Sequence, residues 1–164
     1  GDARSRTWRL QLKIAADTSF LCALYRKQGN SERALACFAS LEQPLTASRL
    51  LLWEFRQSVR FQAFRHSKDR RLGFPYSEAE RMIAKLRQHL DRDAIRLADG
   101  HLTQVLALAE RVSKARTFLG GHRSFDVLHI AAALGMEADA FLSFDANQNA
   151  LAAAEGLATP LATV

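Results

Sequence analysis

The sequence predicts an α/β fold in which a mostly parallel sheet is covered by helices on both faces. Short apolar runs alternate along the chain with longer amphipathic segments, a pattern typical of repeated strand–helix–strand units. Apolar residues make up 48% of the 164 residues and charged residues 24%, which excludes a disordered chain. Ala and Leu are abundant whereas Tyr occurs only twice, and this composition favours helices over an all-β fold. The length fits one domain that buries a core without disulfides.

Five apolar runs are expected to be strands and seven longer segments to be helices. The strands are expected at residues 12–16, 44–47, 96–98, 140–144 and 157–164, the last broken by Pro160. The helices are expected at 18–27, 31–41, 49–64, 77–90, 102–118, 124–134 and 146–155. Residues 28–30 end the first helix, and glycines at 120, 121, 135 and 156 end the last three. Residues 66–76 are polar and basic, so we expect a connection there.

The charge balance favours a polyanionic partner. The chain has 23 Lys and Arg against 17 Asp and Glu, which gives a net charge of +6, and Arg suits phosphate because its guanidinium donates two parallel hydrogen bonds. An ordinary solvated surface is the alternative. The cations form one group on a helix face and a second in the connection after it: Arg49, Arg56 and Arg60, then Arg65, His66, Lys68, Arg70 and Arg71. Phe61, Phe64 and Phe74 lie among these cations, either to stack on bases, to contact a protein or to join the core.

Other sequence features narrow the class of protein. Cys22 and Cys37 have neither CxxC nor metal-ligand spacing, so we expect small buried thiols in a reduced compartment such as the cytoplasm. No apolar run reaches 18 residues, so we expect no membrane span. Residues 1–12 carry three arginines and are expected to be a basic N-terminal extension or a tag remnant before a single domain at 13–164. Neither GxGxxG nor a phosphate-binding P-loop occurs.

Four acids are expected to meet at the carboxyl edge of the sheet, where sites form in open parallel sheets. Asp17 and Asp145 each follow a strand-like run and precede a helix, and helix capping is their alternative role. Glu54 lies on the apolar side of an expected helix, so it either has a buried partner or reaches the rim. Asp126 lies in the first turn of a helix, where interaction with the helix dipole is the alternative.

These carboxylates predict a divalent metal ion. Four carboxylates in one pocket repel each other and raise one another's pKa, and a divalent cation removes this cost. Oxygen ligands suit Mg²⁺ or Mn²⁺ rather than zinc, and such an ion activates water and stabilises charge on phosphate. His122 and His129 flank Asp126 without a metal-binding spacing, so we expect them to support the site or to lie on the surface. A metal-dependent phosphodiesterase is the function class this pattern favours.

Taken together, the motifs resemble the PIN domain family. The matching residues are D-T-S at 17–19, Glu54 in the third helix, R-S-F-D-V-L-H-I-A-A-A at 123–133 and F-L-S-F-D at 141–145, within a resemblance that covers about residues 13–157. The subgroup that looks most similar is the VapC-type toxins of type II toxin–antitoxin pairs. The resemblance implies a three-layer α/β/α sandwich, Mg²⁺- or Mn²⁺-dependent cleavage of RNA, frequent homodimers, and a cognate antitoxin that blocks the site.

The resemblance also implies roles for individual residues. By position, the catalytic and metal-binding acids become Asp17, Glu54, Asp126 and Asp145. The residues that match assisting positions are Thr18, Ser19, Ser143, Asn147 and Arg123. Of these, the hydroxyls beside the first Asp orient water at the metal and Arg123 touches phosphate, whereas Asn147 matches a variable position of doubtful role.

Two other function classes stay open. One is a catalytically degenerate PIN-like module that binds RNA or protein, although all four acids are present. The other is a phosphatase with an Asp nucleophile at the end of the first strand, a pattern that requires a second Asp where this chain has Ser19.

Overall fold

The structure, a computed structural model, describes residues 12–98 and 100–163 and has the predicted α/β architecture. Its strands are β1 (Ile14–Ala16), β2 (Leu45–Ala47), β3 (Ile95–Leu97) and β4 (Ala140–Leu142). Its helices are α1 (Thr18–Tyr25), α2 (Ser31–Ala39), α3 (Arg49–Lys68), α4 (Tyr76–Asp91), α5 (Leu102–Gly120), α6 (Ser124–Gly135) and α7 (Ala146–Ala154). Each of these strands and helices begins and ends within a few residues of its predicted limits.

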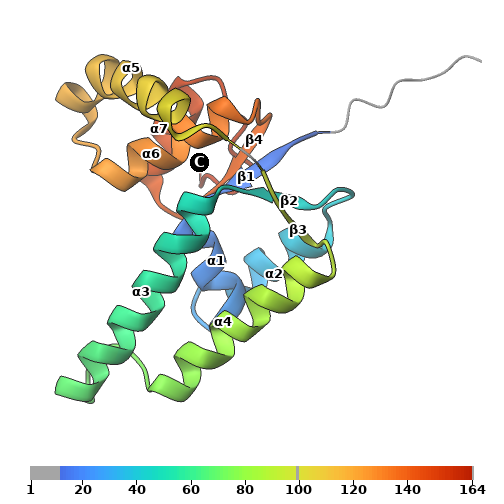
Figure 1. Cartoon of the computed structure of the whole chain (residues 1–164), viewed down its shortest axis with the longest axis vertical. Helices are drawn as coiled ribbons and strands as arrows, with labels where there is room; N and C mark the ends of the chain where they lie inside the picture. The colour runs from blue at the N-terminus through green and yellow to red at the C-terminus, as the bar shows by residue number, and fades with distance from the viewer. Residues whose placement is uncertain (1–11, 99, 164) are drawn as a thin grey trace, which may run out of the picture.

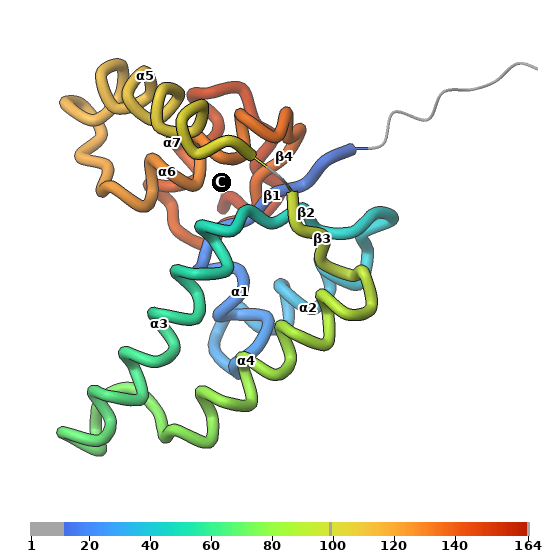
Figure 2. Tube along the Cα trace, in the orientation of Figure 1, coloured from blue at the N-terminus to red at the C-terminus, as the bar shows by residue number. Residues whose placement is uncertain are grey.

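All the strand pairs are parallel, as the alternation of strands and helices predicts. Ladder hydrogen bonds join β1 to β4, with Ile14 opposite Ala140, and β2 to β3, with Leu45 opposite Ile95. The two pairs meet at β1 and β2, which lie side by side (Figures 1 and 2). The carboxyl ends of β1 and β4, which carry two of the predicted acids, therefore lie next to each other.

Two apolar cores cover the two faces of the strands. Successive residues of a strand point to opposite faces, so Ala15 and Phe141 pack with α5, α6 and α7, whereas Ala16 and Leu142 pack with α1, α3 and α4. Figure 1 shows these helices gathered on the two sides of the strands. Burial on both faces explains why β1 and β4 read as continuous apolar runs, and it gives the three-layer arrangement.

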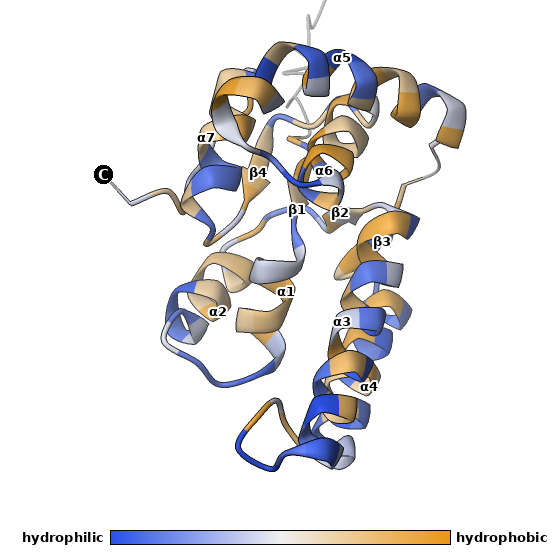
Figure 3. Ribbon diagram, turned by 90° about the vertical axis from the view of Figure 1, so that its left-hand side faces the viewer, coloured by the Kyte–Doolittle hydropathy of each residue, from blue (hydrophilic) through white to orange (hydrophobic). Residues whose placement is uncertain are grey.

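The α3–α4 hairpin extends away from the strands (Figure 1), and its far end is mostly hydrophilic (Figure 3). Gly73 has a positive φ of 59° in the connecting turn, and a Cβ there would lie 2.0 Å from the backbone oxygen of Gln62. Only glycine therefore lets the turn pass so close to α3. Phe74 is buried beside it with the Arg26 guanidinium over its ring, so Phe74 belongs to the core and does not stack on bases.

Three expectations about secondary structure and burial were wrong. Residues 157–163 form no strand, because after one bridge between Ala158 and Ala140 the chain turns at Pro160, which has no N–H to donate. The third helix continues to Lys68, since no Gly or Pro interrupts it, so part of the expected connection is helical. Cys22 and Cys37 form no disulfide and are half-buried rather than fully buried.

Two further expectations concern the N-terminus and membranes. The predicted extension at residues 1–12 lies outside the described residues, except for the exposed Leu12. Within residues 12–98 and 100–163, no helix combines the length and the apolar character that crossing a membrane requires.

Candidate active site

Asp17 follows β1 and begins α1, and its carboxylate is bound by two hydroxyl groups. Its Oδ1 accepts hydrogen bonds from the Ser19 hydroxyl at 2.6 Å and the Phe20 amide at 3.2 Å, and its Oδ2 accepts one from the Ser143 hydroxyl at 2.5 Å. Helix capping and a place in the site are therefore compatible roles of the same side chain. Only 6% of Asp17 is exposed, and this burial raises the pKa of its carboxyl although the hydrogen bonds and His129 lower it.

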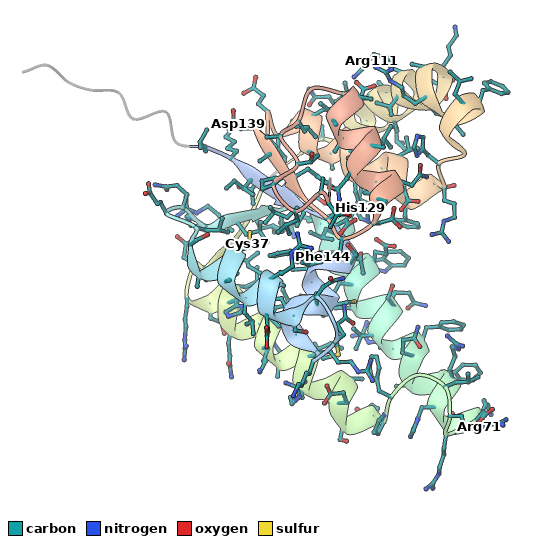
Figure 4. The ribbon with its side chains drawn as sticks, turned by 180° about the vertical axis from the view of Figure 1, so that it is seen from behind. Cys37, Arg71, Arg111, His129, Asp139 and Phe144 are labelled. Atoms are coloured by element: carbon teal, nitrogen blue, oxygen red, sulfur yellow. The ribbon has the colours of Figure 1, made fainter. Side chains whose placement is uncertain are left out.

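Glu54 lies in the second turn of α3, and of its two expected arrangements, a buried partner or a place at the rim, it has the partner. The Thr18 hydroxyl donates to Oε2 at 2.7 Å, and Nε2 of His129 on α6 bonds to the same oxygen. Burial opposes ionisation of Glu54, but the His129 and Thr18 contacts outweigh it and lower the pKa of the carboxyl. His129, which is buried and is labelled in Figure 4, therefore contacts one of the candidate acids directly.

Ser143 and Gln148 connect the remaining acids to Asp17. The buried Ser143 hydroxyl, which donates to Asp17, also accepts a hydrogen bond from the Asp145 amide at 3.0 Å. Asp145 caps α7 by accepting from the Gln148 amide at 2.8 Å, and the Gln148 side chain donates to the backbone oxygen of Asp126 at 3.0 Å. A continuous set of hydrogen bonds therefore runs from β1 through β4 and α7 to α6.

Asp126 and its neighbours occupy the open side of this region. The Asp126 carboxylate lies 3.6 Å from Nε of Arg123, whose side chain is 87% exposed. Asn147 donates to the Gly120 backbone oxygen at 3.3 Å and contacts His122 at the same distance, so it is bound to the connection between α5 and α6. These contacts hold Asn147 at that connection and give no support to a role beside the acids.

The four carboxylates share a region of the molecule but do not form a ligand cluster as they stand. Within the part of the chain that the structure describes, no group of three or more His, Cys, Asp or Glu side chains is close enough to hold a metal ion. Glu54 faces His129 and Asp126 faces Arg123 instead.

The chemistry of the region nevertheless fits a hard divalent cation. Its acids offer only oxygen donors, which suit Mg²⁺ or Mn²⁺. Asp17 is a buried carboxylate with a raised pKa, and a nearby cation would stabilise its charged form. Among the described residues, the buried Gln148 Oε1 and Asn149 Oδ1 accept no hydrogen bond, so oxygen acceptors remain available beside Asp145.

The sequence reading missed two features of this region. One is the buried amide pair Gln148 and Asn149, of which Asn149 donates to the Ser143 backbone oxygen at 3.0 Å. Their signal was that they belong to a run of three amides, at 147–149, at the start of an otherwise Ala-rich helix. The other is the ring contact between Trp53 and Phe125, each of which directly precedes a predicted acid.

Comparison with solved structures shows several proteins of the same fold at low sequence identity. VapC20 of Mycobacterium tuberculosis, described as a sarcin-ricin loop cleaving toxin, is 16% identical over 84% of this chain and 94% of its own, with a TM-score of 0.60. VapBC2 of Rickettsia felis, bound to a DNA fragment from their promoter, is 13% identical over 90% of this chain and 97% of that chain, with a TM-score of 0.61. FitAcB of Neisseria gonorrhoeae is 18% identical over 89% of this chain and 95% of that chain, with a TM-score of 0.57.

No curated protein sequence matches the chain. A family model of the PIN domain, in contrast, matches residues 14–154, from the start of β1 to the end of α7. This match spans most of the sequence and includes all four acids. The chain therefore belongs to the PIN domain family.

Proposed function

We propose that this protein is a Mg²⁺- or Mn²⁺-dependent endoribonuclease that hydrolyses phosphodiester bonds of RNA. The observation that carries the proposal is the continuous set of hydrogen bonds that links Asp17, Asp145 and Asp126 at the carboxyl ends of β1 and β4. Membership of the PIN domain family and the net charge of +6 support it.

In this proposal Asp17, Glu54, Asp126 and Asp145 would hold the metal ion. When bound, the ion would polarise the scissile phosphate and a water molecule and stabilise the charge that develops on the phosphate oxygens. Neighbouring side chains influence the ionisation and the orientation of these carboxylates. His129 and Thr18 keep Glu54 ionised at neutral pH, since they lower the pKa of its carboxyl.

The hydroxyl groups fix the direction of the Asp17 carboxylate. Ser19 bonds to one oxygen and Ser143 to the other, so the carboxylate plane cannot rotate without breaking a buried hydrogen bond. The Thr18 hydroxyl orients the Glu54 carboxylate in the same way. We propose that Arg123, highly exposed beside Asp126, exchanges that carboxylate for a substrate phosphate, which its guanidinium binds through two parallel hydrogen bonds.

We further propose that the chain is the toxin of a toxin–antitoxin pair, that it acts in the cytoplasm and that it forms a homodimer. The fold similarity to VapC20, and to VapBC2 as a complex on promoter DNA, supports a cognate antitoxin protein as partner. The two half-buried cysteines are not joined in a disulfide, which agrees with a reducing compartment.

The second candidate is a catalytically degenerate PIN-like module that binds RNA or protein. One observation favours it: within the described residues the acids do not form a three-ligand cluster. The two functions differ in metal dependence, because a degenerate module would gain nothing from Mn²⁺.

The deciding experiment measures RNA cleavage and metal binding with the same proteins. Wild type, Asp126→Asn and the control Asp91→Asn, an exposed acid at the end of α4, are incubated with total RNA in Mn²⁺, Mg²⁺ or EDTA. Mn²⁺ binding is followed in parallel by the rise in melting temperature. We expect wild type and Asp91→Asn to cleave RNA only with a divalent metal, and Asp126→Asn to lose at least about 100-fold in rate, as expected when a group that stabilises the transition state is removed.

Two outcomes would overturn the proposal. Cleavage by Asp126→Asn at the wild-type rate would remove the assigned acids from the reaction. Absence of both cleavage and any Mn²⁺-dependent rise in melting temperature in folded wild type would leave the binding module as the function.

A further inference from the structure

An aromatic pair lies directly beside the acids and is partly open to solvent. Trp53 on α3 and Phe125 on α6 stack with ring centroids 5.7 Å apart and an interplanar angle of 24°. Trp53 precedes Glu54 in the chain and Phe125 precedes Asp126, so the pair joins the two helices that carry these acids. Trp53 is 54% exposed.

The pair is held firmly relative to the acids. The Phe125 ring lies 6.0 Å, centroid to centroid, from the His129 ring, and His129 is buried and hydrogen-bonded to Glu54. The half-exposed Trp53, stacked on Phe125, therefore lies where the two helices that carry Glu54 and Asp126 meet. A rigid aromatic face needs little loss of conformational freedom to bind a flat partner.

The exposed side of α3 continues this surface away from the acids. At 100° per residue, its members fall within about 100° of arc and span about 22 Å of helix. We call it the α3 stripe, and its exposed residues are Trp53, Gln57, Arg60, Phe61, Phe64 and Lys68. Phe61 and Phe64 stack on each other at 6.1 Å, and the Lys68 ammonium lies 5.4 Å from the Phe64 ring centre. The stripe thus combines three aromatic rings with two cations.

The charge of α3 indicates which kind of partner this surface fits. The helix contains five Lys and Arg, of which Arg60 and Lys68 lie on the stripe, and one acid, Glu54, which lies off the stripe and faces His129. A protein partner that covers aromatic residues has no general need for a row of cations, whereas a nucleic acid strand has both flat bases and a charged backbone. Stacking of a base on an aromatic side chain contributes about 1–3 kcal/mol, and cations along the groove bind the phosphates.

We propose that the Trp53–Phe125 pair is a stacking platform for an unpaired base of the RNA substrate and that the α3 stripe holds the strand beyond it. This inference rests on the proposed ribonuclease function and specifies its substrate as single-stranded or looped RNA. In a double helix the faces of the bases are already stacked on one another, so a duplex cannot use the platform. Arg123, two residues before Phe125 and highly exposed, is assigned to the phosphate between the platform and the acids.

The test measures binding in EDTA, where no cleavage interferes, with a fluorescein-labelled single-stranded 12-mer RNA and the same sequence as a duplex. Anisotropy gives the dissociation constants of wild type, Trp53→Ala, Trp53→Phe and Leu35→Ala. Leu35, on α2, is exposed to the same 54% as Trp53 and serves as the matched control. We expect Trp53→Ala to weaken single-strand binding about 10-fold. Trp53→Phe and Leu35→Ala are expected to stay within about threefold of wild type, and the duplex to bind at least about 10-fold more weakly than the single strand.

A second readout reports on Trp53 itself. Trp8→Phe leaves Trp53 as the sole tryptophan, because the chain has two. We expect the single-stranded RNA, and not the duplex, to quench its fluorescence.

Several results separate this inference from the function on which it rests. Unchanged single-strand affinity in Trp53→Ala overturns the platform even if wild type cleaves RNA. Equal binding and quenching by the duplex overturn it as well. A change of oligomeric state in Trp53→Ala, measured by sedimentation with RNA affinity unchanged, would assign the pair to a protein interface instead. Trp53-dependent binding of the single strand supports the platform independently of the cleavage assay.

Discussion

Ser143 donates its hydroxyl to Asp17 across the ends of two neighbouring strands, with 2.5 Å between the oxygen atoms. The two residues are 126 positions apart in sequence, yet both are buried and they follow β4 and β1 respectively. The same hydroxyl accepts the Asp145 amide. One small side chain therefore couples the acid at the end of β1 to the acid at the end of β4.

Loss of this hydroxyl should destabilise the protein through Asp17. In Ser143→Ala the Asp17 Oδ2 would lose its donor inside the protein, and we expect a cost of about 1–3 kcal/mol at pH 7. Because the cost comes mainly from a buried charge, it should shrink in an Asp17→Asn background. Urea unfolding of the two single variants and the double variant in EDTA gives the coupling energy.

The control for the Ser143 variant is Ser67→Ala, which removes an exposed hydroxyl near the end of α3. We expect it to change the free energy of unfolding by less than about 0.5 kcal/mol. If the Ser143→Ala cost is equal with Asp and with Asn at position 17, the hydroxyl acts through packing or through Asp145 rather than through the Asp17 charge.

Asp17→Asn alone should stabilise the metal-free protein at neutral pH. Burial raises the pKa of Asp17 above its ordinary value of 3.8, so the ionised side chain disfavours the folded state. This cost is absent below pH 3.8, where Asp17 is protonated in both states, and it develops as the pH rises through the folded-state pKa. We expect the melting temperature at pH 7 to rise by about 2–4 °C, the effect of ~1 kcal/mol in a domain of this size.

The measurement is a series of thermal unfolding curves in EDTA between pH 7 and pH 3.5. The advantage of Asp17→Asn should disappear toward the acid end. A lower melting temperature than wild type at pH 7 would show that the hydroxyl donors, and not burial, dominate the energetics of Asp17.

Glu54→Gln should change the melting temperature in the opposite direction to Asp17→Asn. The pKa of Glu54 lies below its ordinary value of 4.5, because the contacts with His129 and Thr18 outweigh burial. Its ionisation therefore stabilises the folded state above pH 4.5, and this contribution is lost as the pH falls through the folded-state pKa. We expect Glu54→Gln to lower the melting temperature at pH 7 by about 2–4 °C, equivalent to ~1 kcal/mol for a lost charge-assisted hydrogen bond.

Glu80→Gln, an exposed acid on α4, is the matched control and should leave the melting temperature unchanged. The difference in melting temperature between Glu54→Gln and wild type should disappear at low pH. A difference in melting temperature that stays constant down to pH 3.5 would contradict the role assigned to the Glu54 charge.

Cys22 offers a chemical probe of the acids. Burial, followed by the charges of Asp17 and Glu54, raises the pKa of the Cys22 thiol to about 11. Asp17→Asn removes one of these charges, so we expect Cys22 to react faster with iodoacetamide at pH 9, by about threefold for half a pKa unit. Peptide mass spectrometry measures the rate. Cys37 is an internal control, because only burial raises its pKa, and an equal change at both cysteines would indicate general loosening instead.

The sequence alone was sufficient for most of the secondary structure, and it placed two of the candidate acids at strand ends. Periodicity located all four strands and seven helices of the described residues, and strand-end position selected Asp17 and Asp145. The expected last strand failed because a short apolar run around Pro160 has no local signal that separates a strand from a single bridge. The third helix was predicted too short, since a polar, basic composition suits an exposed helix as well as a connection.

Local pattern determined which residues of this protein carry charge near the ends of strands, because capping and burial periodicity act over a few neighbouring positions. The tertiary structure decided what those residues contact. That His129 pairs with Glu54, that Ser143 serves both Asp17 and Asp145, and that Trp53 meets Phe125 depends on how α3, α6 and β4 pack. Such contacts join positions up to 126 residues apart, and only the burial of two apolar cores brings those positions together.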